Sequence, residues 1–76
     1  MNIYGYESDE SELISLEEIT LRASVDELND LVDFLKNTIK IIESSKGNFG
    51  HEHFSDFVKK SPKEKPEIII VNNTID

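Results

Sequence analysis

The chain has 76 residues, a formal net charge of −8 at pH 7 and no cysteine. We expect one domain spanning residues 1–76, which buries only about 60% of the surface of its unfolded chain and so has a small core. The lack of cysteine excludes a disulfide framework, a thiolate metal site and a thiol nucleophile. The first ten residues lack a signal-peptide pattern and no stretch approaches the roughly 18 apolar residues of a membrane span, so we expect a cytoplasmic protein without a membrane partner.

The negative charge is concentrated at the start of the chain. Residues 1–30 have nine acidic residues and one arginine, whereas residues 31–76 have seven acidic residues and seven lysines. An acidic surface repels nucleic acid and attracts a basic partner, although it also serves simply as a solvated face. We therefore expect no nucleic-acid partner, and six acidic residues are candidates for binding a basic protein: Glu7, Asp9, Glu10, Glu12, Glu17 and Glu18.

Two strands that form a hairpin are predicted at the start of the chain. Residues 2–6 are rich in aromatic and β-branched side chains, and Gly5 allows a bulge or a close backbone approach. After an acidic turn, residues 13–23 are typical of a second strand because apolar and polar residues alternate from Glu18 onward. Ile14 and Leu16 have the opposite parity, which predicts a bulge near residues 17 and 18, or else a strand that begins only at about Glu18.

A long amphipathic helix is predicted over residues 25–45. Ser24 is a suitable N-cap, and Glu27 completes a capping box, while Gly47 suits the left-handed residue that ends a helix. One apolar stripe is expected to face the core, and it consists of Leu28, Leu31, Val32, Leu35, Ile39 and Ile42 with Val25 at its edge.

Two apolar residues of this helix fall outside the stripe. Phe34 and Ile41 are seven residues apart, so they lie together on the flank of the helix. They need a second covering element, which is either a loop of the same chain or another protein. Both residues are therefore interface candidates.

After the helix we expect a strand over residues 51–54 followed by an irregular or single-turn segment. Residues 59–66 read as a solvated loop because Pro62 and Pro66 prevent regular strand pairing. The last predicted strand contains the continuous apolar run from Ile68 to Val71, which is typical of a strand covered on both faces. Because one helix covers one face of a sheet, Ile69 or Ile70, whichever faces away from the helix, is a further interface candidate.

The only histidines are His51 and His53, which lie two residues apart. On a strand they share one face, as two imidazole ligands of a metal ion would. The sequence offers no clear third ligand, so we predict no metal and no cofactor, with a metal site at the two histidines as the alternative. Structural or interface histidines satisfy the same pattern, and the residues are also candidates for contact with a partner. The pattern contains no phosphate-binding loop, nucleophile elbow or zincin motif.

A series of short motifs runs along nearly the whole chain. They are Glu18-Ile19-Thr20-Leu21, Ala23-Ser24 with Glu27-Leu28, Phe49-Gly50-His51-Glu52-His53-Phe54, and Pro66-Glu67-Ile68-Ile69-Ile70-Val71-Asn72. Together they resemble the immunity protein 32 family of bacterial polymorphic toxin systems, with Gly-His-Glu-His-Phe the most specific. The resemblance implies a small cytosolic protein that protects the producing cell by binding a cognate toxin, without catalytic residues. The lysine-rich insert between Phe57 and Glu67 is unlike a compact family core.

The sequence predicts an α+β fold with two layers, in which one long helix packs on a small, mainly antiparallel sheet in the order strand, strand, helix, strand, strand. The predicted function is non-enzymatic binding, most directly the neutralisation of a basic toxin. A metal-binding protein or metal-dependent enzyme that uses His51 and His53 is one alternative, and a homodimeric accessory protein is another. A homodimer is expected in any case, because a domain of this size gains stability from a second copy.

Overall fold

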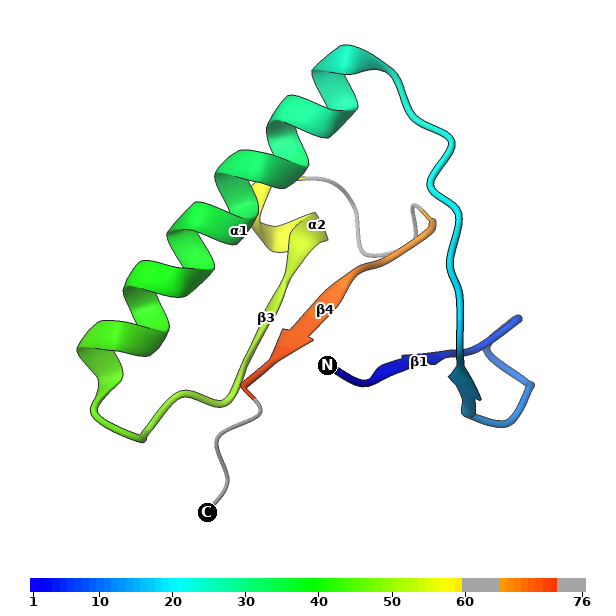
Figure 1. The fold of residues 1–76 in the computed structure, drawn as a ribbon, viewed down its shortest axis with the longest axis horizontal. Coiled ribbons are helices and arrows are strands. Elements are labelled where there is room, and N and C mark those ends of the chain that lie inside the picture. Colours follow the sequence, from blue (N-terminus) through cyan, green and yellow to red (C-terminus); the bar gives the residue numbers. More distant parts are fainter. Residues whose placement is uncertain (60–64, 73–76) are drawn as a thin grey trace.

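The computed structural model describes residues 1–59 and 65–72. Its elements, in chain order, are β1 (Ile3–Gly5), β2 (Ile14–Leu16), α1 (Val25–Ser45), β3 (His51–His53), α2 (Phe54–Phe57) and β4 (Ile69–Val71). The α+β class is confirmed, but the described strands form two separate antiparallel pairs, β1–β2 and β3–β4, in place of the single predicted sheet. Helix α1 lies along one side of the β3–β4 pair, and the β1–β2 hairpin lies on the other side (Figure 1). None of the described helices is long and apolar enough to span a membrane.

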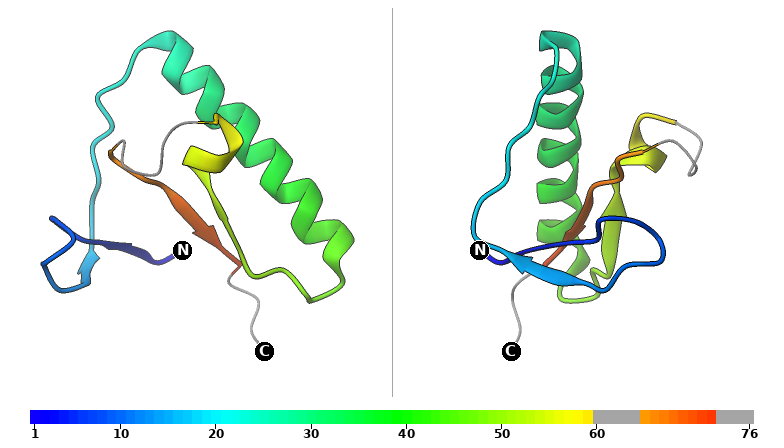
Figure 2. Two further views of the ribbon diagram at one scale, coloured as in Figure 1. Left: turned by 180° about the vertical axis from the view of Figure 1, so that it is seen from behind. Right: turned by 90° about the vertical axis from the view of Figure 1, so that its right-hand side faces the viewer.

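The predicted N-terminal hairpin is confirmed, but β2 is much shorter than expected. Ile3 pairs with Leu16 and Gly5 pairs with Ile14. A Cβ atom on Gly5 would lie 3.1 Å from the Cδ1 atom of Leu16, so the predicted close approach is present. The strand ends at Leu16 without the bulge, because β1 has three residues and leaves residues 19–23 nothing to pair with. These residues belong instead to an exposed connection, the 17–24 segment, that runs from the hairpin to α1 (Figure 2).

Helix α1 has the predicted bounds because local signals fix both ends. The Oγ atom of Ser24 accepts a hydrogen bond from the Glu27 N–H at 3.1 Å, and Oε1 of Glu27 accepts one from the Ser24 N–H at 2.8 Å. This reciprocal pair is the capping box. At the other end Lys46 has a φ of 53° and Gly47 a φ of 92°, so the chain leaves the helix through the left-handed region.

The core lies on a different face of α1 from the predicted one. Phe34 is 0% exposed, and its ring centre lies 5.3 Å from that of Phe54 and 5.7 Å from that of Phe57. Thr38, one turn further along, is also buried. The predicted stripe is instead largely exposed, which corrects the expectation that it faces the core. The reason is that Phe54 and Phe57 of α2 pack against Phe34, so this face of the helix lies against the core.

The C-terminal half of the chain forms a second hairpin with α2 at its end. His53 pairs with Ile69, and the Phe54 N–H donates to the Ile68 carbonyl at 2.8 Å. The strand followed by a single helical turn is therefore confirmed, although the strand ends at His53 and Phe54, predicted to be in the strand, begins α2. Ile70 is half-buried whereas Ile69 and Val71 are exposed, so one face of β4 is covered and the other is open. Of the predicted lysine-rich loop, residues 60–64 lie outside the described residues.

Candidate protein-binding groove

A wide groove of about 1780 Å³ lies between the β1–β2 hairpin and β4. It exceeds the roughly 300–1,000 Å³ of sites that enclose a small molecule. Most of its lining is apolar. The lining residues are 1–9, Leu13, Leu16, Ile19, His53 and 65–72. A groove of this size and composition suits a segment of another protein better than a small ligand.

One wall of the groove is the outer edge of β4. Every residue from Ile68 to Asn72 lines it, although alternate side chains of a strand point to opposite faces. Because residues from both faces of β4 line the groove, the groove runs along the edge of this strand. The bond from Phe54 to Ile68 and the antiparallel register together direct the backbone N–H and C=O groups of Ile69 and Val71 away from β3 and toward the groove. Within residues 1–59 and 65–72, β4 pairs with no strand besides β3.

The opposite wall of the groove carries acidic side chains. All six acidic residues predicted to bind a partner are exposed, and Glu7 and Asp9 line the groove itself. The other four lie in the hairpin turn or directly after β2: Glu10, Glu12, Glu17 and Glu18. The Lys65 ammonium lies 3.7 Å from the Asp9 carboxylate, and both side chains are well exposed. Such a surface ion pair contributes little to stability, so it opens easily for a competing cation.

Within the groove lining, the Glu67 carboxylate accepts hydrogen bonds from α2 and from the start of β4. Oε1 of Glu67 accepts from the Ser55 N–H at 2.9 Å and from the Ile68 N–H at 3.0 Å. Oε2 accepts from the Ser55 hydroxyl and lies 3.3 Å from Nδ1 of His53. Burial raises the pKa of Glu67, but the hydrogen bonds from Ser55, Ile68 and His53 outweigh burial and hold the pKa below its ordinary value of 4.5.

This Glu67 cluster positions backbone and does not form a nucleophilic site. Ser55 is 5% exposed, and its hydroxyl donates to a carboxylate, not to the imidazole that would activate it. The cluster fixes α2 to the residue that leads into β4. Sequence reasoning missed both Glu67 and Ser55, because a contact between residues 12 positions apart leaves no periodic signal.

The two histidines lie next to each other on β3. Their ring centres are 5.0 Å apart, His51 is exposed, and His53 is half-buried beside Glu67. Among the described residues no group of three side chains is arranged to hold a metal ion. Of the two histidines, His53 lines the groove and His51 does not.

No protein-family model, curated protein or solved structure matches this chain. The resemblance to the immunity protein 32 family therefore stays a prediction that rests on the motifs quoted above. The groove and the charges around it carry the functional argument.

The four interface candidates differ in their accessibility. Phe34 is a core residue, which contradicts its selection as an interface residue, and Ile41 on the same flank is half-buried. The cause is α2, whose aromatic rings cover that flank from within the chain. Ile70 is half-buried on the inner face of β4, whereas half of the Ile69 surface is exposed. Of these four residues, Ile69 is the one available to a partner.

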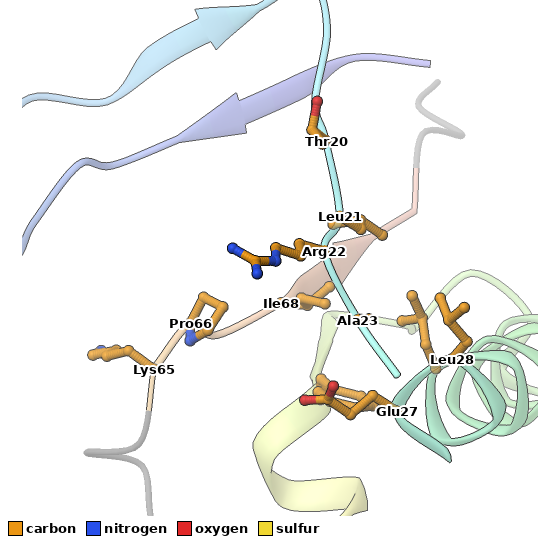
Figure 3. A pocket seen from close by; sticks show the side chains of 11 residues that line it. Thr20, Leu21, Arg22, Ala23, Glu27, Leu28, Lys65, Pro66 and Ile68 are labelled. Carbon is orange, nitrogen blue, oxygen red and sulfur yellow. The ribbon is translucent and has the colours of Figure 1, made fainter. Parts of the chain in front are cut away.

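A second, smaller hollow of about 250 Å³ lies under the 17–24 segment. Figure 3 shows Thr20 to Ala23 of that segment across from Leu28 of α1, with Pro66 and Ile68 along another side. Its acidic group, Glu27, already accepts the capping hydrogen bond from Ser24. The hollow is therefore a packing gap beneath the segment, without an arrangement for acid–base or nucleophilic chemistry.

Proposed function

We propose that this protein is a non-enzymatic binding protein that neutralises a basic protein partner in the cytoplasm, as the resemblance to an immunity family implies. An extended segment of the partner enters the groove and pairs with the outer edge of β4. The observation that carries this proposal is the groove itself, which has an open strand edge on one wall and acidic side chains on the other.

The two walls supply different parts of recognition. An added strand gains affinity from main-chain hydrogen bonds to the outward N–H and C=O groups of Ile69 and Val71, and its alternate side chains meet the apolar lining. The acidic residues of the hairpin attract a positively charged partner and raise its association rate. A basic segment gains from both walls at once.

The charge contribution is tested with the protein encoded by the neighbouring reading frame, because a toxin and its immunity protein are expected side by side. We expect a stable complex with it in calorimetry. The variant Glu7→Gln/Glu10→Gln/Glu12→Gln should weaken binding by about tenfold or more at low salt, mainly through slower association. The control Asp30→Asn/Asp33→Asn/Glu43→Gln changes the net charge equally on exposed positions of α1 and should change affinity by less than threefold. Equal losses in both variants would contradict the hairpin as the docking wall.

The edge contribution is tested by removing one outward N–H group. Ile69→Pro deletes an N–H that points into the groove and should leave the β3–β4 ladder and the circular dichroism spectrum intact while abolishing binding. Ile70→Pro removes an N–H on the β3 side and should unfold the hairpin. A folded Ile69→Pro variant that binds as tightly as the parent would rule out strand addition at this edge.

Metal binding through His51 and His53 is the second candidate function, because their rings meet on one face of β3. Elemental analysis of the purified protein distinguishes the two. The binding function predicts no retained metal. Near-stoichiometric zinc or iron that is lost in His53→Ala would favour the metal site instead.

A further inference from the structure

The exposed apolar stripe of α1 has the spacing of a coiled-coil seam. Six of the seven residues of the predicted stripe, all except Leu31, follow each other at intervals of three, four, three, four and three positions: Val25, Leu28, Val32, Leu35, Ile39 and Ile42. This is the alternation of heptad positions a and d. Five of the six are between 38% and 73% exposed, and Ile42 is half-buried. The stripe extends over residues 25–42, or roughly 27 Å of a helix that has 21 residues.

Apart from Leu28, which also borders the hollow under the 17–24 segment, the stripe is separate from the face that α1 turns toward the core. At about 100° per residue, Phe34 and Thr38 lie roughly a quarter to a third of a turn away from its centre. The helix is thus apolar on two neighbouring faces, of which the chain itself covers one. A helix with two apolar faces normally has both of them buried against other parts of a protein.

The total accessible surface is large for a chain of this mass. The accessible surface is 6761 Å² for a chain of 8.7 kDa, whereas a compact monomer of that mass exposes about 4,700 Å². The radius of gyration is 13.3 Å, compared with about 11.4 Å for a compact domain of this length. The excess of about 2,000 Å² exceeds the roughly 800 Å² that each partner buries in a standard interface. One helix interface therefore fits within it, and surface remains for the groove.

We infer that the stripe binds the same stripe of a second copy of this chain, with the two α1 helices antiparallel. When the two-fold axis passes between Val32 and Leu35, each of the six residues of one copy meets one of the six of the other. The layers pair Val25 with Ile42, Leu28 with Ile39, and Val32 with Leu35. None of the six is then left in water.

The helix dipole of α1 favours this orientation. The first half of the helix carries its aspartates and Glu27, while both of its lysines, Lys36 and Lys40, lie in the second half. At 100° per residue the aspartates point away from the stripe, and the charged residues beside it are Lys36 and Glu43. The orientation therefore rests on the helix dipoles, which oppose each other in an antiparallel pair and are aligned in a parallel one. The flanking charges argue for a second copy in preference to the basic partner of the groove, because the stripe is flanked by both signs of charge.

The oligomeric state and the position of the interface are tested by sedimentation of the full chain from 1 to 100 µM. We expect a dimer, and Leu35→Glu should weaken dimerisation by 100-fold or more with the helical circular dichroism retained. Ile69→Glu places the same charge on the exposed face of β4 and should leave the dimer intact. A monomeric parent at 100 µM, or a dimer dissociated by Ile69→Glu and not by Leu35→Glu, would overturn the inference.

Orientation is tested by cross-linking, which does not depend on whether Leu35→Glu folds. The chain has no cysteine of its own, so Leu28→Cys and Ile39→Cys each introduce a single thiol. Mixed and oxidised, the two variants should form a disulfide-linked heterodimer, while each alone should form none, because identical positions lie roughly 16 Å apart along an antiparallel pair. Disulfide dimers of each variant alone would indicate parallel helices, and no cross-link in any mixture would contradict the α1 interface.

Discussion

The Ser55 hydroxyl and N–H both donate to the carboxylate of Glu67, twelve residues further along the chain. The same carboxylate accepts from the Ile68 N–H, so one side chain satisfies donors from α2 and from the entry to β4. A buried donor without an acceptor costs more free energy than a hydrogen bond normally contributes. Glu67 therefore links α2, which follows β3, to the start of β4.

Removal of this carboxylate should destabilise the fold. Glu67→Ala leaves the Ser55 and Ile68 donors without their acceptor and should lower the free energy of unfolding by about 1–3 kcal/mol in urea titration. Glu10→Ala, which truncates an exposed acidic residue of the hairpin turn, is the matched control and should change it by less than about 0.5 kcal/mol. A Glu67→Ala variant as stable as the control would mean that water replaces the carboxylate at no cost.

The contribution of Glu67 should depend on pH with a defined sign. Its pKa in the folded state lies below 4.5, so the stabilisation is fully present above pH 4.5 and is lost as the pH falls through the lowered pKa. We expect the difference in unfolding free energy between the parent and Glu67→Gln to shrink as the pH falls below 4.5. A difference that grew on acidification would contradict the assignment.

Gly47 should tolerate alanine less well than Gly50. Neither glycine has an atom within 4 Å of the position of an added Cβ, so steric contact does not distinguish them. Gly47 has a φ of 92°, which is strained for alanine, whereas Gly50 has no positive φ. Gly47→Ala should cost about 1 kcal/mol, and Gly50→Ala should be neutral or slightly stabilising in thermal unfolding. Equal effects would remove backbone strain as the cause.

The capping box should contribute measurably to the stability of α1. Ser24→Ala removes the oxygen that accepts from the Glu27 N–H and should cost about 1 kcal/mol. Ser44→Ala, in the exposed last turn, is the control and should cost a few tenths of that. The free energies of unfolding of the two variants can be compared by chemical denaturation.

Phe34 and Leu35 are neighbours with different expected behaviour. Phe34→Leu leaves a gap between the rings of Phe54 and Phe57 and should cost about 1–3 kcal/mol at every protein concentration. Leu35→Ala should lower stability at 100 µM and have a much smaller effect on dilution, because Leu35 is partly exposed in one chain. A large, concentration-independent loss for Leu35→Ala would place it in the core after all.

The bounds of α1 were predictable because their signals are local. Ser24, Glu27 and Gly47 act within one turn of the helix ends, and no distant part of the chain competes with them. The inward face was not predictable in the same way. Six aliphatic residues outweigh Phe34 in any periodic pattern, and a buried polar residue such as Thr38 adds no apolar signal.

Partner contacts and core contacts also look alike in a sequence. A stripe that a second helix would cover has the same spacing as one that a sheet covers, so the pattern alone assigned it to the core. The candidate groove was partly predictable, since the acidic residues of the hairpin were identified by their charge. Its β4 wall was not, because whether a strand edge is open depends on which strands pair, and the sequence suggested one sheet where two pairs form.

The exposed 17–24 segment makes the acidic hairpin separable by a protease. Arg22 lies in this segment, and it is the only lysine or arginine before Lys36. Trypsin cleavage after Arg22 should therefore divide the protein into an acidic peptide of residues 1–22 and a part that contains α1, β3 and β4. The partner-attracting charge and the helix that pairs with a second copy would then be on different molecules.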